Sequence, residues 1–329
     1  MKKFDMPRKK IGFFPTPITE LKQLSKKLGG PRIFIKRDDL TGLAFGGNKT
    51  RKLEFLIGDA LSKGCDTIIT GGAEQSNHCR QTAAACALSG LECHLVLGGS
   101  EPELPKGNFL LDKLFAANIH WTGTFRKGEK IPQITEELIR LGKKPYIIPY
   151  GGSNEIGVVG FVEAVNELKT QLKEMNEKIS HVVFASSSGG THAGLVLGKY
   201  IYNQNYILIG VEIDKEEFGN LVYSDHLLNL TNSSAKFLGI DHTFTKNDLI
   251  LKNEYLGEGY GVVGELEKNA IKLLAETEGI LVDPVYTGRT FGALVDMIKR
   301  GEFKNTDAVL FWHTGGSPSI FSYAEKILL

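Results

Sequence analysis

Short apolar runs alternate with longer segments whose apolar residues recur every three or four positions. The short runs predict β-strands, and the periodic segments predict amphipathic helices. Strands are predicted at residues 33–36, 67–70, 94–97, 146–148, 182–185, 207–212, 280–282 and 309–313, and helices at 75–89, 108–117, 131–141, 156–174, 192–202, 262–278, 291–299 and 318–328. This alternation is typical of an α/β fold with open, twisted, mostly parallel sheets flanked by helices.

One stretch, residues 229–261, is too polar and too broken to predict a regular element. We expect loops there that shape a pocket. No internal repeat and no long linker interrupts the rest of the pattern.

Length and charge narrow the range of partners. The 329 residues suggest about two domains, and a net charge of +1 gives no reason to expect a nucleic acid or an anionic membrane as partner. No segment has the apolar length of a membrane span, and the basic start of the chain, residues 1–10, lacks the apolar run of a signal peptide. We therefore expect a cytoplasmic protein that acts on a small molecule.

The four cysteines, Cys65, Cys79, Cys86 and Cys93, form no CxxC pair. Their spacing therefore predicts no zinc or other metal site. Cys79 and Cys86 fall on one face of a predicted helix, where a buried thiol acts as a small apolar filler.

A glycine pair stands just before a helical pattern in the stretch GGNKTRKLE, residues 46–54. The glycines allow a tight turn and a close approach to a ligand, and they place Lys49 at the start of a helix. Near the positive end of the helix dipole, the amine of Lys49 is shifted toward the neutral form that a Schiff-base lysine needs. Lys52 follows one turn later, where it can meet an anion.

Two later loops join a predicted strand to a predicted helix, the position where open α/β sheets bind ligands. In residues 71–78, Ser76 and Asn77 either cap the helix or help its amino terminus to bind a carboxylate. The loop of residues 186–194 can cradle a phosphate with its backbone N–H groups and hydroxyls. The glycine spacing does not match a dinucleotide fingerprint, and the loop lacks the lysine of a Walker A motif, so a monophosphate fits better.

A phosphate loop, a candidate Schiff-base lysine and a carboxylate-binding helix start together predict a pyridoxal-phosphate enzyme that acts on an amino acid. The motifs GGNKTRKLE, QSNH at 75–78, SSSGGTHAG at 186–194, GEGYG at 257–261, DPVYTG at 283–288 and HTGG at 313–316 occur in this order. Together they resemble the family of D-cysteine desulfhydrase and 1-aminocyclopropane-1-carboxylate (ACC) deaminase, over nearly the whole chain.

The resemblance implies a tryptophan-synthase-β-like fold, called fold type II, in a homodimer. It implies a large cofactor domain formed by residues 1–50 and 159–329 and a small domain formed by residues 51–158. The implied cofactor is pyridoxal 5'-phosphate.

The resemblance also implies a role for each matching residue. Lys49 would bind the cofactor covalently, Lys52 would lie by its phosphate, Asn77 would bond its phenolic oxygen, and Thr314 would meet its pyridine nitrogen. The phosphate would be held by Ser188, Gly189, Gly190 and Thr191. The catalytic residues would be Lys49, Ser76, Tyr260 and Tyr286. The residues facing the substrate would be Ser76, Asn77, His78, Tyr260, Tyr286 and Thr287.

Two threonines separate the activities of this family. ACC deaminases carry a glutamate and typically a leucine where this chain has Thr287 and Thr314, whereas D-cysteine desulfhydrases carry the pattern seen here. The sequence thus predicts a pyridoxal-phosphate-dependent lyase that converts D-cysteine to pyruvate, ammonia and hydrogen sulfide by α,β-elimination, with Lys49 as the base that removes the Cα proton.

Several alternatives stay open at this point. The same site could act on ACC, L-cysteate or β-chloro-D-alanine, and the chain could be a catalytically silent binding protein that keeps the fold. The residue types do not fix the D/L preference, and they do not decide which tyrosine protonates the leaving sulfur.

Overall fold

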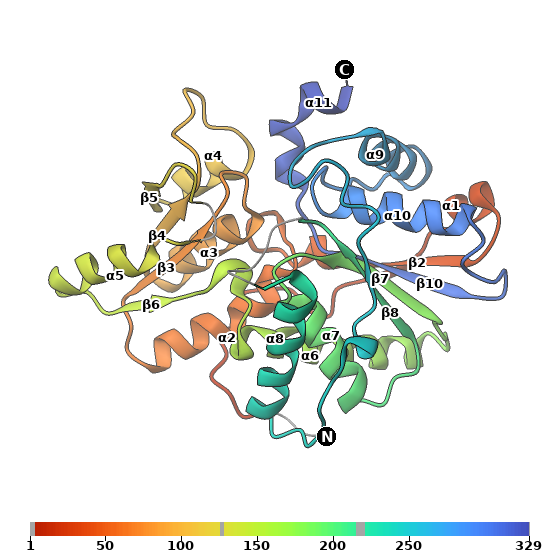
Figure 1. Cartoon of the computed structure of the whole chain (residues 1–329), viewed down its shortest axis with the longest axis horizontal. Coiled ribbons are helices and arrows are strands. Elements are labelled where there is room, and N and C mark those ends of the chain that lie inside the picture. The colour runs from red at the N-terminus through yellow and green to blue at the C-terminus, as the bar shows by residue number, and fades with distance from the viewer. Residues whose placement is uncertain (1–3, 126–127, 215–220, 329) are drawn as a thin grey trace.

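The computed structural model describes residues 4–125, 128–214 and 221–328 and places them in two β-sheets flanked by helices (Figure 1). Residues 1–3, where the basic segment of the sequence begins, lie outside this range. The larger sheet has the strand order β1-β2-β10-β7-β8-β9, and the smaller one has the order β5-β4-β3-β6. All neighbouring strands are parallel except β1 and β2. The predicted fold class is therefore confirmed.

The strands are short, as expected for a parallel sheet that is covered on both faces. Their bounds are β1 Ile18–Glu20, β2 Arg32–Arg37, β3 Thr67–Gly72, β4 Glu92–Leu97, β5 Asn118–Trp121, β6 Pro145–Ile147, β7 His181–Ser186, β8 Ile207–Glu212, β9 Leu251–Lys252 and β10 Ala308–His313.

The helices lie between the strands along the chain. Their bounds are α1 Lys22–Leu28, α2 Lys49–Ser62, α3 Asn77–Ser89, α4 Gly107–Leu114, α5 Ile131–Arg140, α6 Glu155–Glu174, α7 Gly190–Ile201, α8 Tyr223–Phe237, α9 Glu265–Glu278, α10 Thr287–Lys299 and α11 Ala324–Leu328. Short 3-10 turns occupy η1 Asp38–Leu40, η2 Leu43–Phe45, η3 Tyr150–Gly152, η4 Lys246–Asp248 and η5 Ser317–Ser322.

Three sequence predictions were wrong. Residues 280–282 form no strand, although Ile280 and Val282 are buried in the core beneath α9 and α10. The stretch 229–261 is partly helical, because α8 runs as far as Phe237 and buries one face that includes Leu227, Leu230 and Ala235. The end of the chain, predicted as one helix, is divided into η5 and α11.

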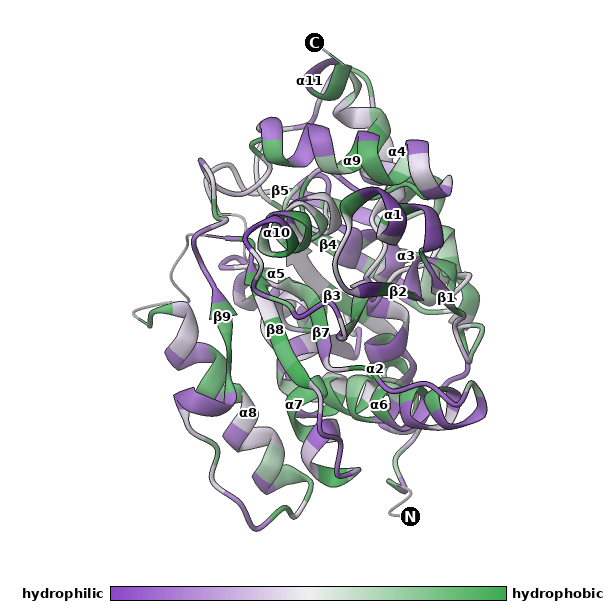
Figure 2. Ribbon diagram, turned by 90° about the vertical axis from the view of Figure 1, so that its right-hand side faces the viewer, coloured by the Kyte–Doolittle hydropathy of each residue, from purple (hydrophilic) through white to green (hydrophobic). Residues whose placement is uncertain are grey.

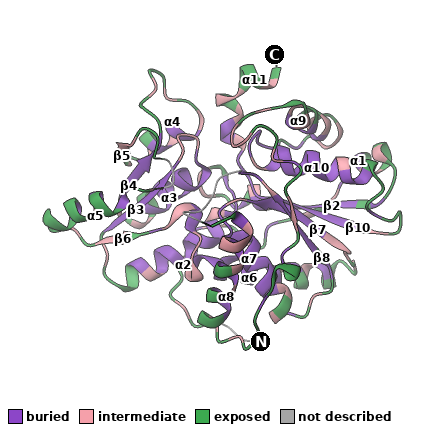
Figure 3. Cartoon of the chain, viewed as in Figure 1, coloured by how far each residue is buried: buried purple, intermediate pink, exposed green. Residues whose placement is uncertain are grey.

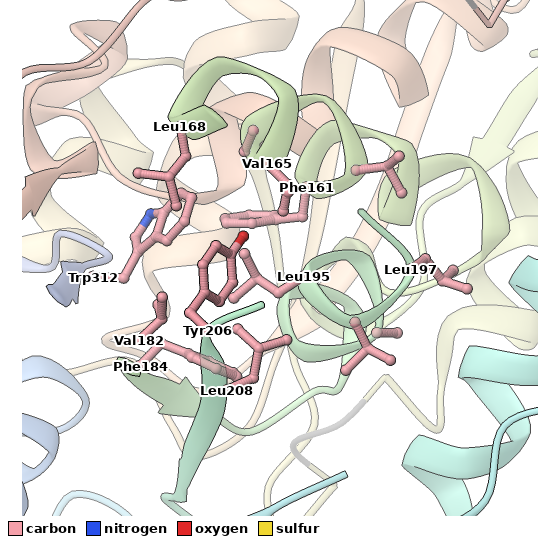
Figure 4. Close-up of a cluster of buried hydrophobic side chains, with 14 of the residues drawn as sticks. Phe161, Val165, Leu168, Val182, Phe184, Leu195, Leu197, Tyr206, Leu208 and Trp312 are labelled. Atoms are coloured by element: carbon pink, nitrogen blue, oxygen red, sulfur yellow. The ribbon is translucent and has the colours of Figure 1, made fainter. Parts of the chain in front are cut away.

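Each buried strand contributes side chains to two cores, because successive side chains point to opposite faces of the sheet. On the larger sheet, Val182 and Trp312 pack under α6 and α7, while Val183 and Phe311 pack under α9 and α10. Figure 4 shows Phe161 of α6, Leu195 of α7 and Trp312 pointing toward one another in the first of these cores.

The smaller sheet follows the same rule. Ile68 of β3 packs against α2, α3 and α4, and its neighbour Ile69 packs against α5 on the other face. Cys79 and Cys86 are fully buried in the first of these cores, where they fill space as small apolar side chains. The central strands, such as β7 and β8, are largely apolar (Figure 2) and buried (Figure 3), whereas the short strands β1, β5, β6 and β9 are half-buried or partly exposed. Polar, exposed residues lie on the outer faces of the helices.

The two sheets meet at helices α2 and α6. Helix α2 packs against α6 of the larger unit and against α3 of the smaller one. The predicted domain limits, after residues 50 and 158, fall inside α2 and α6, and these limits stay predictions. None of the helices in the described ranges is long and apolar enough to cross a membrane.

A buried ionic network joins these elements. Arg51 of α2 donates hydrogen bonds to Asp38 after β2 and to Glu167 of α6, and Lys36 of β2 also donates to Glu167. The indole N–H of Trp312 donates to Asp38 at 2.8 Å. The network ties the beginning of α2 to both β2 and β10.

Candidate active site

A cavity lies at the junction of the two sheets, where β3, β7 and β10 end and where α2, α3, α7 and α10 begin. Its lining consists of Asn48, Lys49, Ser76, Asn77, His78, Tyr150, Gly151, Ala185, Ser186, Ser187, Ser188, Gly189, Thr191, His192, Tyr286, Thr314 and Gly315. None of these lining residues is an aspartate or a glutamate. The chain thus brings together segments that are more than 250 residues apart in the sequence.

Lys49 is the first residue of α2, as the sequence predicts, and its amine lines the cavity. The Nζ atom donates a hydrogen bond to Asn48 Oδ1 at 3.1 Å. Burial, followed by the positive charge of Arg80, lowers the pKa of Lys49 to about 8, although Asp283 acts in the opposite direction. At pH 7 roughly a tenth of this amine is therefore neutral and nucleophilic, far more than for a lysine with an ordinary pKa.

Lys52 lies one turn further along α2 and is buried. Its Nζ donates to the backbone oxygen of Gly151 at 3.0 Å and to Ser153 Oγ at 3.1 Å. Burial, with a smaller effect from Lys49, lowers the pKa of Lys52 well below its usual value. A bound anion would restore its charge, because an opposite charge favours the protonated amine.

The predicted phosphate loop turns from β7 into α7. Ser188 Oγ lies 2.8 Å from Ser153 Oγ, and the same Ser153 oxygen accepts a hydrogen bond from the backbone N–H of Gly190 at 3.0 Å. Asn48 Nδ2 donates to Thr191 Oγ1 at 3.0 Å, which ties the loop to the Lys49 segment. Ser188, Gly189 and Thr191 line the cavity, whereas Gly190 lies behind it.

Glycine is required where this loop meets Lys52. A Cβ atom on Gly190 would lie 2.8 Å from Lys52 Nζ, and one on Gly151 would lie 2.2 Å from Ser188 Oγ. Gly151 also has a φ of 65°, which other residues rarely adopt. The backbone can therefore approach an anion closely, and the first N–H groups of α7 have no partners inside the helix.

Ser76 caps α3 and also lines the cavity. Its Oγ accepts a hydrogen bond from the N–H of Cys79 at 3.2 Å, which is the ordinary capping role. The two interpretations made from the sequence are therefore compatible, since a capped helix start that opens into a cavity still presents N–H groups to a carboxylate.

Asn77 has its amide orientation set by its neighbours. Its Oδ1 accepts hydrogen bonds from Arg80 Nη1 at 3.2 Å and from Asn108 Nδ2 at 2.9 Å. With the oxygen occupied, the NH₂ group is the part that remains to donate toward a ligand in the cavity. This is the orientation that an anionic oxygen of a cofactor requires.

His78 is held in one tautomer. The hydroxyl of Thr70 donates to the backbone oxygen of Ile148 at 2.8 Å, so this hydroxyl accepts from His78 Nε2 at 2.9 Å. His78 Nδ1 thus keeps its lone pair, and it has no hydrogen-bond partner within the protein. Burial, together with Lys49 and Lys52, lowers the pKa of His78 well below its usual value, so the ring is neutral.

Tyr286 precedes α10 and lines the cavity, and Tyr260 lies behind it. Their hydroxyl oxygens are 2.8 Å apart, and their rings pack edge to face. Burial raises the pKa of Tyr286 and of Tyr260 well above the usual value. Both phenols therefore keep their protons at neutral pH and are able to donate.

Thr287 does not reach the cavity. It is fully buried, and its hydroxyl donates to Asp283 Oδ1 at 2.6 Å. Asp283 also accepts the backbone N–H groups of Val285, Tyr286 and Thr287, so this carboxylate is occupied in capping α10. The structure thus gives Thr287 a structural position, and the predicted contact between Thr287 and substrate has no support in the geometry.

Thr314 follows β10 and lines the cavity as a buried residue. Its backbone oxygen accepts the N–H of Asn48 at 2.9 Å, which joins the end of β10 to the Lys49 segment. The side chain of Thr314 is neutral, and its contact with the ring nitrogen of the cofactor stays a prediction.

Sequence reasoning missed several residues of this site. Asn48, Tyr150 and His192 line the cavity, and Arg80 and Asn108 support it from behind. Asn48, Arg80 and His192 are in or next to the motifs, which was a usable signal. Tyr150 and Asn108 stand in unremarkable stretches, so only the fold brings them to the site.

The chain matches the family model described as "Pyridoxal-phosphate dependent enzyme" over residues 10–315. It therefore belongs to this family of pyridoxal-phosphate-dependent enzymes. The predictions of the cofactor and of an enzyme that depends on it are confirmed.

Individual relatives cover nearly the full length. The chain is 42% identical over 328 residues to a *Pyrococcus abyssi* protein provisionally named 1-aminocyclopropane-1-carboxylate deaminase, covering 98% of this chain and 95% of the relative. It is 43% identical over 323 residues to a D-cysteine desulfhydrase of *Klebsiella pneumoniae* strain 342, covering 96% of both.

Solved structures agree on the fold. A crystal structure described as an ACC deaminase homologue has a TM-score of 0.90 at 40% identity, with 98% of this chain and 96% of that chain covered. Threonine deaminase isoform 2 from *Solanum lycopersicum*, at 17% identity and a TM-score of 0.64 with 95% and 82% covered, shares the fold alone.

The cavity fits pyridoxal phosphate at three separate points. The loop with its glycines and Lys52 would hold the phosphate, the NH₂ group of Asn77 would donate to the phenolic oxygen, and Lys49 would supply the amine for covalent attachment. Lys49, Asn77 and the loop line one cavity, and Lys52 reaches its edge through the hydrogen bond to Gly151.

Proposed function

We propose that this enzyme catalyses the α,β-elimination of D-cysteine. In this reaction D-cysteine and one water molecule give pyruvate, ammonia and hydrogen sulfide. The *Klebsiella* relative named for this activity supports the proposal, as does the pattern of Thr287 and Thr314.

One observation carries the choice of substrate: the cavity lining contains a hydroxyl at Thr314 and no carboxylate. A carboxylate near the pyridine nitrogen would keep it protonated and make the ring a strong electron sink, which the opening of a cyclopropane ring needs. A neutral hydroxyl gives a weaker sink. This suffices for D-cysteine, because sulfide is a good leaving group once the Cα proton is gone.

The start of α3 would bind and orient the substrate. Its N–H groups and the Ser76 hydroxyl offer an anion site for the substrate carboxylate. Pyridoxal phosphate, when bound, supplies a ring that stabilises the charge left at Cα.

Two side chains would move protons in this site. The amine of Lys49, whose pKa is lowered to about 8, would take the proton from Cα. The protonated phenol of Tyr286 would give a proton to the sulfur as the Cβ–S bond breaks, and Tyr260 would orient Tyr286 through the contact between their hydroxyls. The released enamine then hydrolyses in water to pyruvate and ammonia.

A substrate panel tests this proposal. The holoenzyme is incubated with D-cysteine, L-cysteine, ACC, L-cysteate and β-chloro-D-alanine, and pyruvate, 2-oxobutanoate, sulfide and sulfite are measured. We expect D-cysteine to give pyruvate and sulfide in equal amounts at the highest kcat/KM. A higher kcat/KM for ACC, with 2-oxobutanoate as product, would instead support the activity in the name of the *Pyrococcus* relative.

Location, assembly and domain limits stay predictions from the sequence. We propose a cytoplasmic homodimer, and analytical ultracentrifugation of the purified protein would test the dimer.

A further inference from the structure

Arg80 of α3 is a fully buried arginine without an ion-pair partner in the part of the chain that the structure describes. Among the described residues, no carboxylate oxygen lies within 4.0 Å of its guanidinium, in contrast to Arg51 and Arg289, which are also buried but are paired with Asp38 and Glu267. Buried charges are normally paired. The unpaired charge of Arg80 therefore indicates that this charge has a role in the protein.

The contacts of Arg80 connect it to the cofactor site. Nη1 donates to Asn108 Oδ1 at 2.8 Å and to Asn77 Oδ1 at 3.2 Å, and Nη2 donates to the backbone oxygen of Gly46 at 2.7 Å. Gly46 stands three residues before Lys49. One guanidinium thus holds both the segment that positions Lys49 and the side chain of Asn77.

Asn108 of α4 completes the arrangement. Its Oδ1 faces Arg80, and its Nδ2 donates to the backbone oxygen of Gln75 at 2.7 Å and to Asn77 Oδ1 at 2.9 Å. Neither amide can be flipped without placing donor against donor or acceptor against acceptor. We call these three residues, Arg80, Asn108 and Asn77, the amide clamp.

The charge of Arg80 is not cancelled by its surroundings. Burial lowers the pKa of Arg80 to about 10, so the guanidinium stays protonated at neutral pH. Two acidic groups, Asp112 and Asp283, act on Arg80 in the opposite direction. Burial raises the pKa of Asp112 well above its usual range, which favours its neutral form, and both of its oxygens lack hydrogen-bond partners. Asp283 is engaged in capping α10, and the positive charge of Arg80 still acts on Lys49 in the cavity.

We propose that Arg80 and Asn108 are positioning residues of the cofactor site: the amide clamp fixes Asn77 as a donor to the phenolic oxygen, and Arg80 also holds the backbone of Gly46, three residues before Lys49. The positive charge of Arg80 also lowers the pKa of the Lys49 amine. The proposal rests on Lys49 and Asn77 as cofactor contacts and is independent of which substrate the enzyme uses.

Other titratable groups also face Lys49, and they must be held constant in a test. Lys52 lies on the same helix, His78 lies on α3, and Asp283 precedes α10. Asp283 opposes the effect of Arg80. A change at Arg80 alone leaves all three in place.

The first test measures the titration of Lys49 in full-length protein freed of cofactor. Trace acetylation with acetic anhydride is followed across pH by mass spectrometry of the peptide that contains Lys49. We expect a midpoint near 8 in the wild type and a midpoint about one pH unit higher in Arg80→Gln. Arg80→Lys keeps the charge and should restore the wild-type midpoint to within about 0.3 pH units.

The second test measures the dissociation constant of pyridoxal phosphate at pH 8 by equilibrium dialysis. Asn108→Ala and Arg80→Gln should bind about tenfold more weakly, because Asn77 is free to turn. Thr82→Val is the matched control on α3, since the Thr82 hydroxyl is buried, lacks a partner and lies outside the amide clamp. This control should bind as the wild type does.

Two results would overturn the proposal. One is a Lys49 midpoint in folded Arg80→Gln that equals the wild-type value. The other is cofactor binding by Asn108→Ala as tight as that of Thr82→Val, a result that stays decisive even if Arg80→Gln fails to fold. Neither readout involves D-cysteine, so failure here is distinct from failure of the proposed reaction.

Discussion

At the scale of single residues, the site works by placing ordinary side chains in unusual surroundings. Lys49, His78 and Tyr286 all have pKa values shifted by burial, and each shift favours the neutral form of the group. A neutral amine can take a proton, and a neutral phenol can give one. The cavity therefore contains a protonated acid, Tyr286, and a base, Lys49, whose neutral form becomes the major one above about pH 8.

Replacing Lys49 by alanine should abolish most of the elimination. We expect pyruvate production from D-cysteine to fall about 1,000-fold, because the base that removes the Cα proton is lost. Lys63→Ala is the control, since Lys63 is an exposed lysine just after the same helix. Turnover by Lys49→Ala at close to the rate of the control would contradict the role of Lys49.

Substrates with different leaving groups test whether Tyr286 donates a proton to the departing sulfur. In Tyr286→Phe, kcat with D-cysteine should fall about 100-fold, because the departing sulfur loses its proton donor. With β-chloro-D-alanine the loss should be much smaller, since chloride leaves without a proton. Tyr260→Phe should have a weaker effect on D-cysteine, because Tyr260 acts through Tyr286. Equal losses with both substrates would show that Tyr286 has another role.

At the scale of elements, hydrogen bonds from several strands and helices fix the beginning of α2, where Lys49 stands. Arg51 sits two residues after Lys49 and is bound to Asp38 and Glu167, so β2 and α6 both restrain it. Burial opposes ionisation of Glu167, yet the hydrogen bonds and charges of Arg51 and Lys36 prevail and lower the pKa of Glu167 to about 2. The ionised carboxylate is therefore part of the folded state.

This network predicts how stability depends on pH. Because the pKa of Glu167 is lower in the folded state, its contribution is complete above about pH 4.5 and is lost as the pH falls toward 2. At pH 7, Glu167→Gln should lower the free energy of unfolding by about 3 kcal/mol.

Urea unfolding of Glu167→Gln and of the wild type at pH 7, 4 and 3 measures the difference. It should shrink at pH 4 and again at pH 3. A stability difference between the two proteins that stays constant from pH 7 to pH 3 would contradict the lowered pKa of Glu167.

The sequence predicted the strands that consist of long runs of apolar residues, and it missed the very short ones. Strands β7, β8 and β10 are long apolar runs, and all three were predicted. β1 and β9 have three and two residues, which is too few for a recognisable pattern. They form because their backbones pair with the edges of β2 and β8. Residues 280–282 were predicted as a strand because they are apolar. They are apolar because they pack in a core, and a strand would also need a neighbouring strand to pair with.

At the scale of the whole molecule, the site exists only because distant segments converge. The Lys49 segment is joined to Thr314 and to Thr191 by single hydrogen bonds across the junction of the two sheets. The motifs predicted most of the cavity lining, since QSNH, SSSGGTHAG and HTGG stand at the ends of the parallel strands β3, β7 and β10. The amide clamp could not be predicted, because Asn108 has no motif and reaches Asn77 only through the packing of α4 on α3.

Cofactor binding at this junction should stabilise the whole fold. Pyridoxal phosphate that binds only the folded state at 100 times its dissociation constant adds about 2.7 kcal/mol. We expect the Tm of the apoprotein to rise by several degrees when pyridoxal phosphate is added. Lys49→Ala should show a smaller rise, because it cannot form the covalent bond. An unchanged wild-type Tm would argue against the site described above.

The central claim is that this cavity eliminates sulfide from D-cysteine. The most direct measurement follows the visible spectrum of the purified holoenzyme while D-cysteine is added, with sulfide and pyruvate assayed in the same tube. The account predicts a cofactor band that responds to D-cysteine and equal amounts of the two products. A cofactor band with neither product would contradict it.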